Sequence, residues 1–543
     1  MPFPDFTPTF PGLLHHAARF GDHTYLVADD DRITYAELVT RTGELARGFL
    51  AAGIGKGSHV GILIPNSVDT AVVGFALLRI GAVVVPINTF LKTRELGWTI
   101  HHADLTELVT HPRFSTNDYV ERLEAALPGL ADQSADTRLL VRDAPFLRAI
   151  HVWGDTDRGW ARGGEADVVA RAARVGVDDA FLARAEECVV PADPALIVYS
   201  SGSTADPKGV LHSQGAVVRH SSNVLIGYPM GPDDVVFSSM PFFWIGGLVT
   251  ALYEVMHVGA TLVTQAAFDP GAALDLIERE GATNVTGWPQ QGTTMSEHPS
   301  YTPARVATVV RTSMPDLVPP AQRPPEVNST SLGMTEMCSV HTSWDQYDPL
   351  PESRRGTFGK SLPGIEHKVV DPVSGEEVAP GGDGELWVRG YSLMQGLHRR
   401  EREEVFEPDG WYRTGDAGHF DADGWFYFSG RLGEMLKTPG GVNVTPAEVE
   451  AALMAFPDVL EAYVTGIPTD GGQLVVGAVV PRAGDILDGD ELRARLKGEL
   501  SAYKVPKHLW VCAKSELPFL ESGKIKKQEL AALLAARVAQ STA

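Results

Sequence analysis

Cysteine is scarce in this chain of 543 residues. The three cysteines, Cys188, Cys338 and Cys512, are widely spaced and odd in number. This pattern provides neither a disulfide framework nor the closely spaced pairs of a zinc site. We therefore expect reduced thiols, each packed in the core of a cytoplasmic protein.

Long apolar runs are absent as well. The longest apolar segment, residues 71–87, contains Arg79 and two glycines. It predicts a buried helix followed by a strand rather than a membrane span. Residues 1–12 lack the basic start and apolar stretch of a secretory signal. We expect no secretory signal and no membrane span.

Basic residues are in the minority. Lys and Arg number 46 against 69 Asp and Glu, which gives a formal net charge of −23. Nucleic acids and acidic membranes are therefore poor candidates for the main partner. Apolar residues make up 44% of the chain and charged residues 21%, as in soluble globular enzymes. The length exceeds what one core usually holds, which predicts at least two domains.

The first half of the chain alternates helical and strand-like patterns. Residues 33–54 have helical periodicity, with Thr34 as the N-cap and Glu37 three residues later. A strand-like segment, residues 59–65, follows, and the alternation continues. This βαβ rhythm predicts a largely parallel sheet covered by helices. Residues 130–187 are polar and charged, and their pattern predicts no clear element.

The pattern changes twice in the second half. From Gly356, short β-type runs are broken by Gly, Pro and Asp, which predicts an antiparallel β region. Beyond Arg431, residues 434–543 contain a small set of helical and strand-like segments. We interpret this set as a second, α+β domain.

A hydroxyl-rich stretch, YSSGSTADPKGVLHS at residues 199–213, follows an apolar strand-like run. Glycines let a backbone approach phosphate closely, main-chain N–H groups and hydroxyls donate hydrogen bonds, and a lysine offsets the charge. It is not a Walker A loop, because Gly209 follows Lys208 where Ser or Thr is required. Alone, such a loop is more often a solvated turn, but this ordered set favours phosphate binding.

The stretch resembles the signature loop of the adenylate-forming superfamily, which includes acyl-CoA synthetases, peptide-synthetase adenylation domains and beetle luciferases. The resemblance covers nearly the whole chain and implies an α/β fold. A large N-terminal domain of stacked α/β sheets with a β-barrel-like region would span residues 1–432, and a small mobile α+β domain residues 433–543. Further stretches occur in the family's order: PFFWIGGL from Pro241, SLGMTE from Ser331, GELWVRG from Gly384, GWYRTGDAGHFDADGWFYFSGR from Gly410, LKTPGGVNVTPAEVE from Leu436 and SGKIKKQEL from Ser522.

The resemblance implies a ligase reaction in two steps, with ATP, Mg²⁺ and coenzyme A. A carboxylate attacks the α-phosphate of ATP to give an acyl-adenylate, and the thiol of coenzyme A then displaces AMP. Lys524 would be the catalytic lysine that bridges the carboxylate and the α-phosphate. Thr335 would contact the α-phosphate, and Glu336 would hold Mg²⁺.

The same resemblance assigns the nucleotide site. Asp416 would accept hydrogen bonds from both ribose hydroxyls, because an ionised carboxylate offers only acceptors. Arg431 would assist there, and Phe428 would lie near the adenine. The full ATP-binding set is Ser200, Ser201, Gly202, Ser203, Thr204, Lys208, Leu332, Gly333, Asp416, Phe428 and Arg431.

The sequence departs from the family pattern at three places. Ala205 occupies a position that is commonly Gly, and Leu332 stands where many relatives have an aromatic residue. The segment RTSMPDL from Arg311 replaces the usual Gly-Gly-Ala type near the adenine. The acyl pocket is expected at Trp244 and Gly246, where an indole would shape a largely apolar cavity for a hydrophobic or polycyclic acid of medium to large size.

The remaining assignments concern motion, the acceptor and partners. Gly433 is the predicted hinge between the two poses of the small domain, and Gly440 and Gly441 are predicted to line the coenzyme A tunnel. An acyl carrier protein or an amine remains open as the acceptor. A nucleotide-binding relative without catalysis is the alternative of another class. A role in fatty acid metabolism is expected, and a homodimer is open as the assembly.

Overall fold

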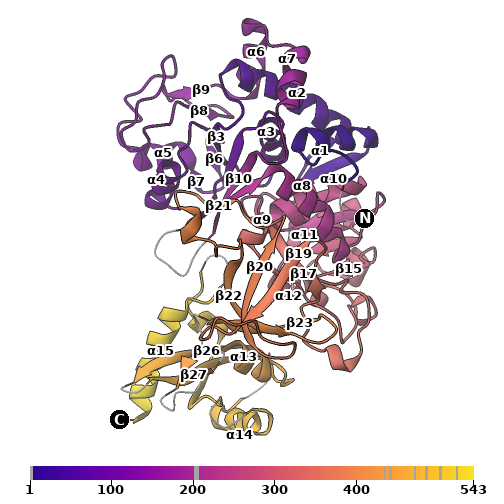
Figure 1. Ribbon diagram of the computed structural model, residues 1–543, viewed down its shortest axis with the longest axis vertical. Coiled ribbons are helices and arrows are strands. Elements are labelled where there is room, and N and C mark those ends of the chain that lie inside the picture. Colours follow the sequence, from indigo (N-terminus) through magenta and orange to yellow (C-terminus); the bar gives the residue numbers. More distant parts are fainter. Residues whose placement is uncertain are drawn as a thin grey trace. The chain divides into compact units, whose positions relative to one another are not determined.

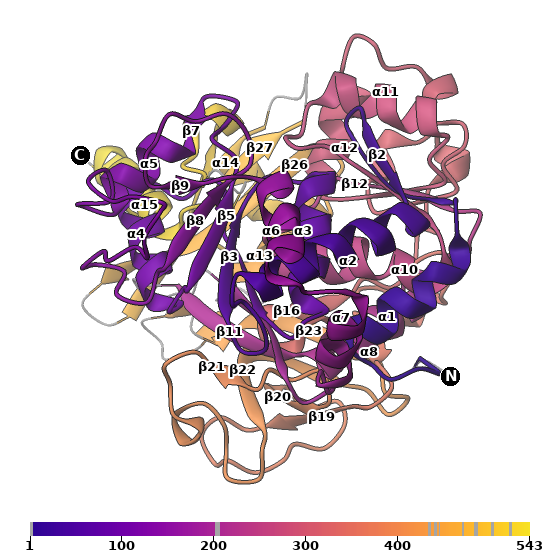
Figure 2. The same ribbon diagram turned by 90° about the horizontal axis from the view of Figure 1, so that it is seen from above.

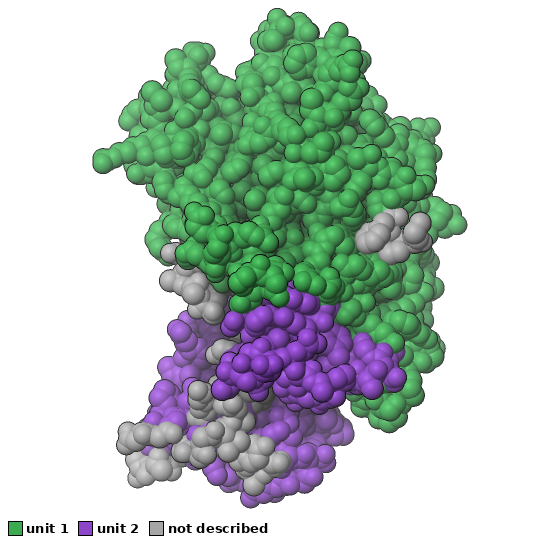
Figure 3. Space-filling model, viewed as in Figure 1, with its two compact units in different colours: residues 1–366, 389–410 green, residues 367–388, 411–543 purple. Residues whose placement is uncertain are grey.

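The computed structural model describes residues 4–200, 207–432, 436–438, 443–444, 446–469, 472–482, 487–500, 504–520 and 524–542 (Figure 1). The chain divides into two compact units, coloured separately in Figure 3. The first unit contains residues 1–366 and 389–410, and the second contains residues 367–388 and 411–543. The predicted boundary between residues 432 and 433 remains a prediction.

Two sheets form the framework of the first unit. The larger has the strand order β21-β11-β10-β4-β3-β5-β8-β9. Its strands from β10 to β9 are parallel, as predicted, while β11 pairs antiparallel with β10 and β21. The strands are β3 (His59–Leu63), β4 (Val83–Pro86), β5 (Glu107–Thr110), β8 (Ala149–Val152), β9 (Ala161–Arg162), β10 (Pro194–Ser200), β11 (Lys208–Ser213) and β21 (Gly396–Leu397).

The second sheet of this unit has the order β15-β14-β12-β13-β1-β2. All its pairs are parallel except the β1–β2 hairpin. The strands are β1 (Thr24–Ala28), β2 (Asp31–Thr34), β12 (Val235–Ser238), β13 (Thr261–Thr264), β14 (Asn284–Thr286) and β15 (Arg311–Thr312). Two smaller sheets complete the unit. One pairs β6 (Arg113–Phe114) with β7 (Asn117–Asp118), and the other has β17 (Ser339–Ser343) between β16 (Leu332–Met334) and β18 (Lys360–Ser361).

Helices cover both faces of the eight-stranded sheet (Figure 2). Val60 and Ile62 of β3 pack with α2 and α3, whereas Val83 and Val85 of β4 pack with α4 and α5 on the other face. Side chains of successive strand residues point to opposite faces, which divides the core in this way. The helices of the unit are α1 (Phe10–Ala17), α2 (Tyr35–Ala51), α3 (Val68–Leu78), α4 (Thr93–His102), α5 (Tyr119–Ala126), α6 (Glu165–Val175), α7 (Asp179–Glu187), α8 (Gln214–Asn223), α9 (Ile245–Gly247), α10 (Val255–Val258), α11 (Pro270–Glu280) and α12 (Pro289–Ser296).

The first predicted helix begins as its capping pattern requires. The Glu37 N–H donates to the Thr34 hydroxyl oxygen over 3.2 Å, and the Thr34 N–H donates to the Glu37 carboxylate over 2.9 Å. These reciprocal bonds satisfy two N–H groups that have no partner inside the helix. The predicted start of α2 is thus confirmed.

The second unit combines an antiparallel sheet with a small α+β fold. The sheet has the order β19-β20-β22-β23, and β22 pairs antiparallel with both β20 and β23, as predicted. In the α+β part, α13 and α14 pack on one face of the sheet β26-β27-β28, and α15 packs on the other. The elements are β19 (Ile365–Val370), β20 (Gly384–Gly390), β22 (Tyr412–Phe420), β23 (Phe426–Arg431), β24 (Leu436–Lys437), β25 (Asn443–Val444), α13 (Pro446–Met454), β26 (Val459–Thr469), β27 (Gly472–Pro481), α14 (Gly489–Glu499), β28 (His508–Val511) and α15 (Lys527–Thr542).

The cysteine prediction holds at two of three positions. Cys338 and Cys512 are buried free thiols. Cys188 is exposed, so its expected core packing is wrong. It follows directly after α7, which contributes a single buried residue, Leu182, to the core. Among the described helices, none combines the length and the apolar character needed to cross a bilayer.

Candidate nucleotide and acyl sites

The two ends of the hydroxyl-rich loop are fixed by a hairpin in the first unit. Ser200 is the last residue of β10, and Lys208 is the first residue of β11. The two residues are direct partners across the antiparallel pair. The remaining predicted members of the loop, Ser201, Gly202, Ser203 and Thr204, lie outside the described residues. The hairpin therefore brings Ser200 and Lys208, the first and last predicted members of the loop, side by side.

Thr335 and Glu336 form a tight turn that joins β16 to β17. The turn η7 (Thr335–Met337) is held through its main chain. The ring Nε2 of His212 lies 2.7 Å from the Thr335 carbonyl oxygen, and the Met394 N–H donates to the Glu336 carbonyl over 2.8 Å. Both side chains are half-buried, so they remain accessible. A half-exposed carboxylate on an anchored turn suits a Mg²⁺ ion whose other ligands are phosphate oxygens and water.

Two buried histidines that the sequence analysis missed support this turn. His212 on β11 bonds to Thr335, and Nε2 of His220 on α8 lies 2.8 Å from the carbonyl oxygen of Val340 on β17. Burial lowers the pKa of each ring to about 4, and the hydrogen bond to the carbonyl only partly opposes that effect. Both rings are therefore neutral near pH 7, with the proton on Nε2. The signal in the sequence is a histidine inside the apolar segment GVLHS.

The ribose-binding pair is assembled in the second unit by strand register. Asp416 on β22 and Arg431 on β23 are direct cross-strand partners. Arg431 Nε lies 2.7 Å from Asp416 Oδ1, and the Asp416 side chain is 2% exposed against 51% for Arg431. Phe428 on β23 pairs with Gly418 and is half-buried. The hairpin thus presents an acidic group, its cation and an aromatic ring within one sheet.

Lys524 lies in the second unit, shortly before α15. The Leu520 N–H donates to the Lys524 carbonyl over 2.8 Å, and Phe519 bridges to Ile525. The main chain is therefore held while the lysine side chain is exposed. This is the arrangement needed by a lysine that approaches a ligand from solvent. The predicted Gly433, Gly440 and Gly441 lie outside the described residues.

The remaining nucleotide-site predictions fall on β16. Leu332 pairs with Thr342 of β17, and Gly333 pairs with Val340. Leu332 is half-buried and Gly333 is exposed. The strand therefore leads directly into the Thr335–Glu336 turn and places these four residues on one continuous segment.

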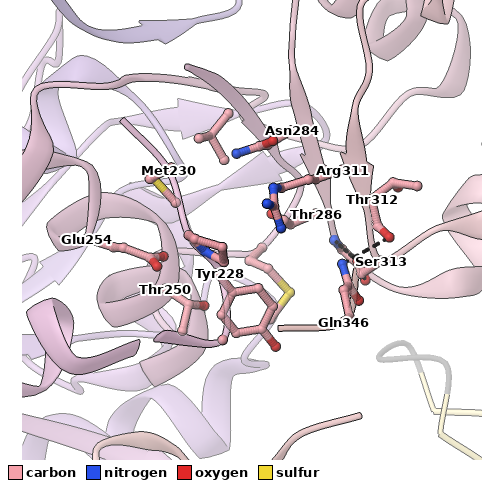
Figure 4. Close-up of a pocket in the computed structure, with 15 residues that line it drawn as sticks. Tyr228, Met230, Thr250, Glu254, Asn284, Thr286, Arg311, Thr312, Ser313 and Gln346 are labelled. Carbon is pink, nitrogen blue, oxygen red and sulfur yellow. Dashed lines mark hydrogen bonds between the residues drawn. The ribbon is translucent and has the colours of Figure 1, made fainter. Parts of the chain in front are cut away.

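A cavity of about 170 Å³ lies in the first unit, beside the strands β12, β14 and β15 (Figure 4). Its walls come from the segment after α8, from η3 (Leu248–Tyr253) and from the ends of β14 and β15. Lining residues used below are Tyr228, Met240, Glu254, Asn284 and Arg311.

The predicted pocket residues lie on the segment just before η3, and η3 contributes to the cavity wall. Trp244 and Gly246 are not among its described lining residues, whereas Thr250 on the following turn is. Trp244 instead packs edge-on against Trp288, with ring centroids 5.5 Å apart. The segment that begins at Arg311, expected near the adenine, contributes to the cavity wall. The assignment of Trp244 and Gly246 to the acyl pocket remains a prediction.

Comparison with known proteins shows two family models along the chain. The AMP-binding enzyme family matches residues 13–398, and the AMP-binding enzyme C-terminal domain matches residues 448–524. A sulfoacetate–CoA ligase of Cupriavidus necator is 32% identical over 544 residues, covering 97% of this chain and 98% of the relative. An indoleacetate–CoA ligase of Aromatoleum aromaticum is 30% identical over 511 residues, covering 93% of each.

Solved structures agree with these matches. The crystal structure of ATP-bound MatB from Rhodopseudomonas palustris has a TM-score of 0.76 at 26% identity, covering 96% of this chain and 98% of that one. The α/β fold with an antiparallel region and a small C-terminal domain is thus confirmed. The first family model alone covers well over half of the chain. The chain belongs to the AMP-binding, adenylate-forming enzyme family, with acid–CoA ligase homologues along its full length.

Proposed function

We propose that the protein is an AMP-forming acid–CoA ligase. The observation that carries this proposal is a direct contact between the cavity wall and the segment that contains Thr335 and Glu336. The Tyr228 hydroxyl, which lines the cavity, donates to Ser331 Oγ over 3.4 Å. Ser331 directly precedes the segment that ends in Thr335 and Glu336. An acid whose body fills the cavity can therefore extend its carboxylate toward the residues assigned to the α-phosphate.

The first step joins the acid to AMP. A carboxylate oxygen bonds to the α-phosphorus of ATP while the bond to the bridging oxygen breaks, and pyrophosphate leaves. The loop from Ser200 to Lys208 would hold the β- and γ-phosphates, and Glu336 would hold Mg²⁺, which would offset phosphate charge. Thr335 donates to the α-phosphate. Lys524 stabilises the negative charge that develops there.

The second step transfers the acyl group to sulfur. The thiolate of coenzyme A bonds to the acyl carbon, the bond from that carbon to the phosphate oxygen breaks, and AMP leaves. Gly433 serves as the hinge that brings the small domain into this pose, because glycine accepts a wide range of dihedral angles. In this proposal Gly440 and Gly441 would contact the pantetheine arm.

The acid has a compact and mainly apolar body. Val236, Met230 and Met240 supply apolar wall to the cavity. A cavity of about 150 Å³ accommodates a benzene ring in another protein, so about 170 Å³ provides room for one substituted ring. The two CoA ligase relatives named above favour coenzyme A as the acceptor.

Product analysis by mass spectrometry tests the proposal. The protein is incubated with ATP, Mg²⁺ and a panel of carboxylic acids, with and without coenzyme A. Acyl-CoA and AMP, formed together and only with coenzyme A present, are the expected products. An acyl-adenylate that accumulates and ignores coenzyme A would move the acceptor to a carrier protein or an amine. ATP binding without any product would favour the non-catalytic alternative.

A further inference from the structure

Glu254 is a buried acid that the reaction described above does not use. It follows η3 directly and begins the turn into α10. The residue is 1% exposed and lines the cavity. Its Oε1 has no hydrogen-bond partner, and its carboxyl group forms no ion pair with any described residue. Figure 4 shows this carboxyl group pointing into the cavity.

The helix is distorted where it presents this residue. Within η3 the backbone of Thr250 leaves helical geometry, at φ −98° and ψ 18°, and its hydroxyl donates to the Gly246 carbonyl over 2.7 Å. Wide helical turns of this kind are rare and occur frequently at functional sites. Thr250 and Glu254 both line the cavity. The local distortion therefore belongs to the cavity wall that carries Glu254.

Asn284 is a second buried polar group of the same cavity. It lies at the start of β14, where its main chain pairs with Val236 on one side and Arg311 on the other. The side chain is 5% exposed, and its Oδ1 has no partner among the described residues. Buried polar groups without partners are uncommon and costly, so two in one cavity call for an explanation.

The two groups are neutral when the cavity is empty. Burial raises the pKa of the Glu254 carboxyl well above its usual range, because the charged form loses its hydration there. A neutral carboxyl and a carboxamide each offer one donor and one acceptor side. Water can satisfy both in the resting enzyme, and a substrate that displaces this water must replace its hydrogen bonds.

Arg311 does not turn the cavity into an anion site. Its Nη1 donates to Asp345 Oδ1 over 2.9 Å, and its guanidinium lies over the Tyr347 ring, 5.4 Å from the centroid. The carboxylate of Asp345 therefore balances the positive charge. An acid with a second anionic group would find Arg311 already paired with Asp345 on one side of the cavity and the Glu254 carboxyl on another. Neither side would offer it an unpaired positive charge.

We propose that the acid activated by this enzyme carries a neutral hydrogen-bonding group, such as a hydroxyl, on the part of the acyl body remote from its carboxylate, and that Glu254 and Asn284 recognise this group. The inference rests on the proposed function. It distinguishes the substrate both from purely apolar acids and from acids with a second negative charge. A site built to hydrogen-bond a substrate rejects the analogue that lacks the group, because its own buried polar atoms are then left unpaired.

Three matched acids test this recognition: 3-phenylpropanoate and its para-hydroxy and para-carboxylate derivatives. Adenylation is followed by ATP–pyrophosphate exchange, and binding without ATP is measured by calorimetry. We expect kcat/KM for the hydroxy acid to exceed those for the other two by about tenfold or more. Glu254→Leu should abolish this preference, whereas Glu254→Gln, which stays polar, should retain most of it. Glu297→Leu, an exposed residue of the same unit, is the matched control.

The outcomes separate the inference from the proposed function. Equal or better use of the unsubstituted acid, a preference for the dicarboxylate, or an unchanged preference in a folded Glu254→Leu variant would overturn the inference. Selective binding of the hydroxy acid without any exchange would support the inference and contradict the proposed function. Absence of both exchange and selective binding would contradict both the inference and the proposed function.

Discussion

Arg431 Nε lies 2.7 Å from Asp416 Oδ1, across two neighbouring strands of an antiparallel sheet. The register of β22 and β23 sets this distance, since the two residues are direct partners. The buried carboxylate has its cation on one side and keeps acceptor capacity for other donors. This geometry suits the binding of two vicinal hydroxyl groups.

Removal of the Asp416 carboxylate should therefore weaken the use of ATP. A hydrogen bond to a charged group contributes about 1.5–3 kcal/mol, so Asp416→Ala should lower kcat/KM for ATP by roughly 10- to 150-fold. Pyrophosphate exchange at varied ATP concentration measures the effect. Arg482→Gln, an exposed residue of the same unit, should leave it unchanged. An Asp416→Ala variant with native ATP dependence would refute the ribose assignment.

The position of Lys524 predicts that the two half-reactions separate. Lys524→Ala should slow adenylation by about 10²- to 10³-fold, because a cation at the developing charge is lost. Thioester formation from supplied acyl-adenylate should continue at the native rate. Rapid-quench assays of each half-reaction provide the measurement, with the exposed Lys507→Ala as the control. Equal loss in both halves would contradict the two-pose account.

The buried histidines predict how stability depends on pH. The pKa of His212 and His220 is about 4 in the folded protein, against 6.5 for an exposed ring. Between these values the unfolded chain binds more protons, so the free energy of unfolding should fall as pH decreases from about 6.5 to 4. Each ring contributes up to ~3 kcal/mol to this fall. Above pH 6.5 these groups should cause no change.

Urea unfolding of the first unit at several pH values checks this dependence. His212→Gln should flatten the curve between pH 6.5 and 4, while the exposed His23→Gln should not. A stability that is constant over this range would mean that neither ring is held neutral. Activity at pH 7 is a second readout for His212→Gln, since the variant loses the ring that holds the Thr335 carbonyl.

The thiols should differ in their reaction with iodoacetamide. Cys188 is exposed, whereas Cys338 is fully buried and Cys512 is 6% exposed. Burial also raises the pKa of both inner thiols, which lowers their thiolate fraction. Peptide mapping of the native protein should show alkylation at Cys188 first. Labelling of Cys338 at a similar rate would contradict its burial.

Local patterns of the sequence were sufficient for several of these features. The cap at Thr34 and Glu37 depends on residues three apart. Asp416 and Arg431 were assigned through the family resemblance, and their pairing across one hairpin is a finding of the structure. Such short-range relationships follow from turn and strand geometry. The family motifs also allowed Glu336 and Lys524 to be predicted as site residues. The structure adds the main-chain hydrogen bonds that hold both of them.

Contacts between residues that are distant in the sequence could not be predicted from the sequence. Glu254 and Asn284 lie on different elements, and a cavity wall, not a motif, unites them. Neither residue type at those positions signals a pocket on its own. The helices within residues 130–187 could not be predicted for another reason. Because α6 and α7 bury only one or two side chains each, the periodic apolar pattern that marks a helix is weak there.

The most direct test of the central claim follows oxygen from the acid into AMP. An acid that the enzyme uses as substrate is labelled with ¹⁸O in its carboxylate and incubated with ATP, Mg²⁺ and coenzyme A. The mass of the nucleotide product is then measured by mass spectrometry. An acyl-adenylate intermediate predicts AMP that carries one ¹⁸O atom, together with pyrophosphate and acyl-CoA. Unlabelled AMP, or ADP in place of AMP, would contradict the proposed ligase.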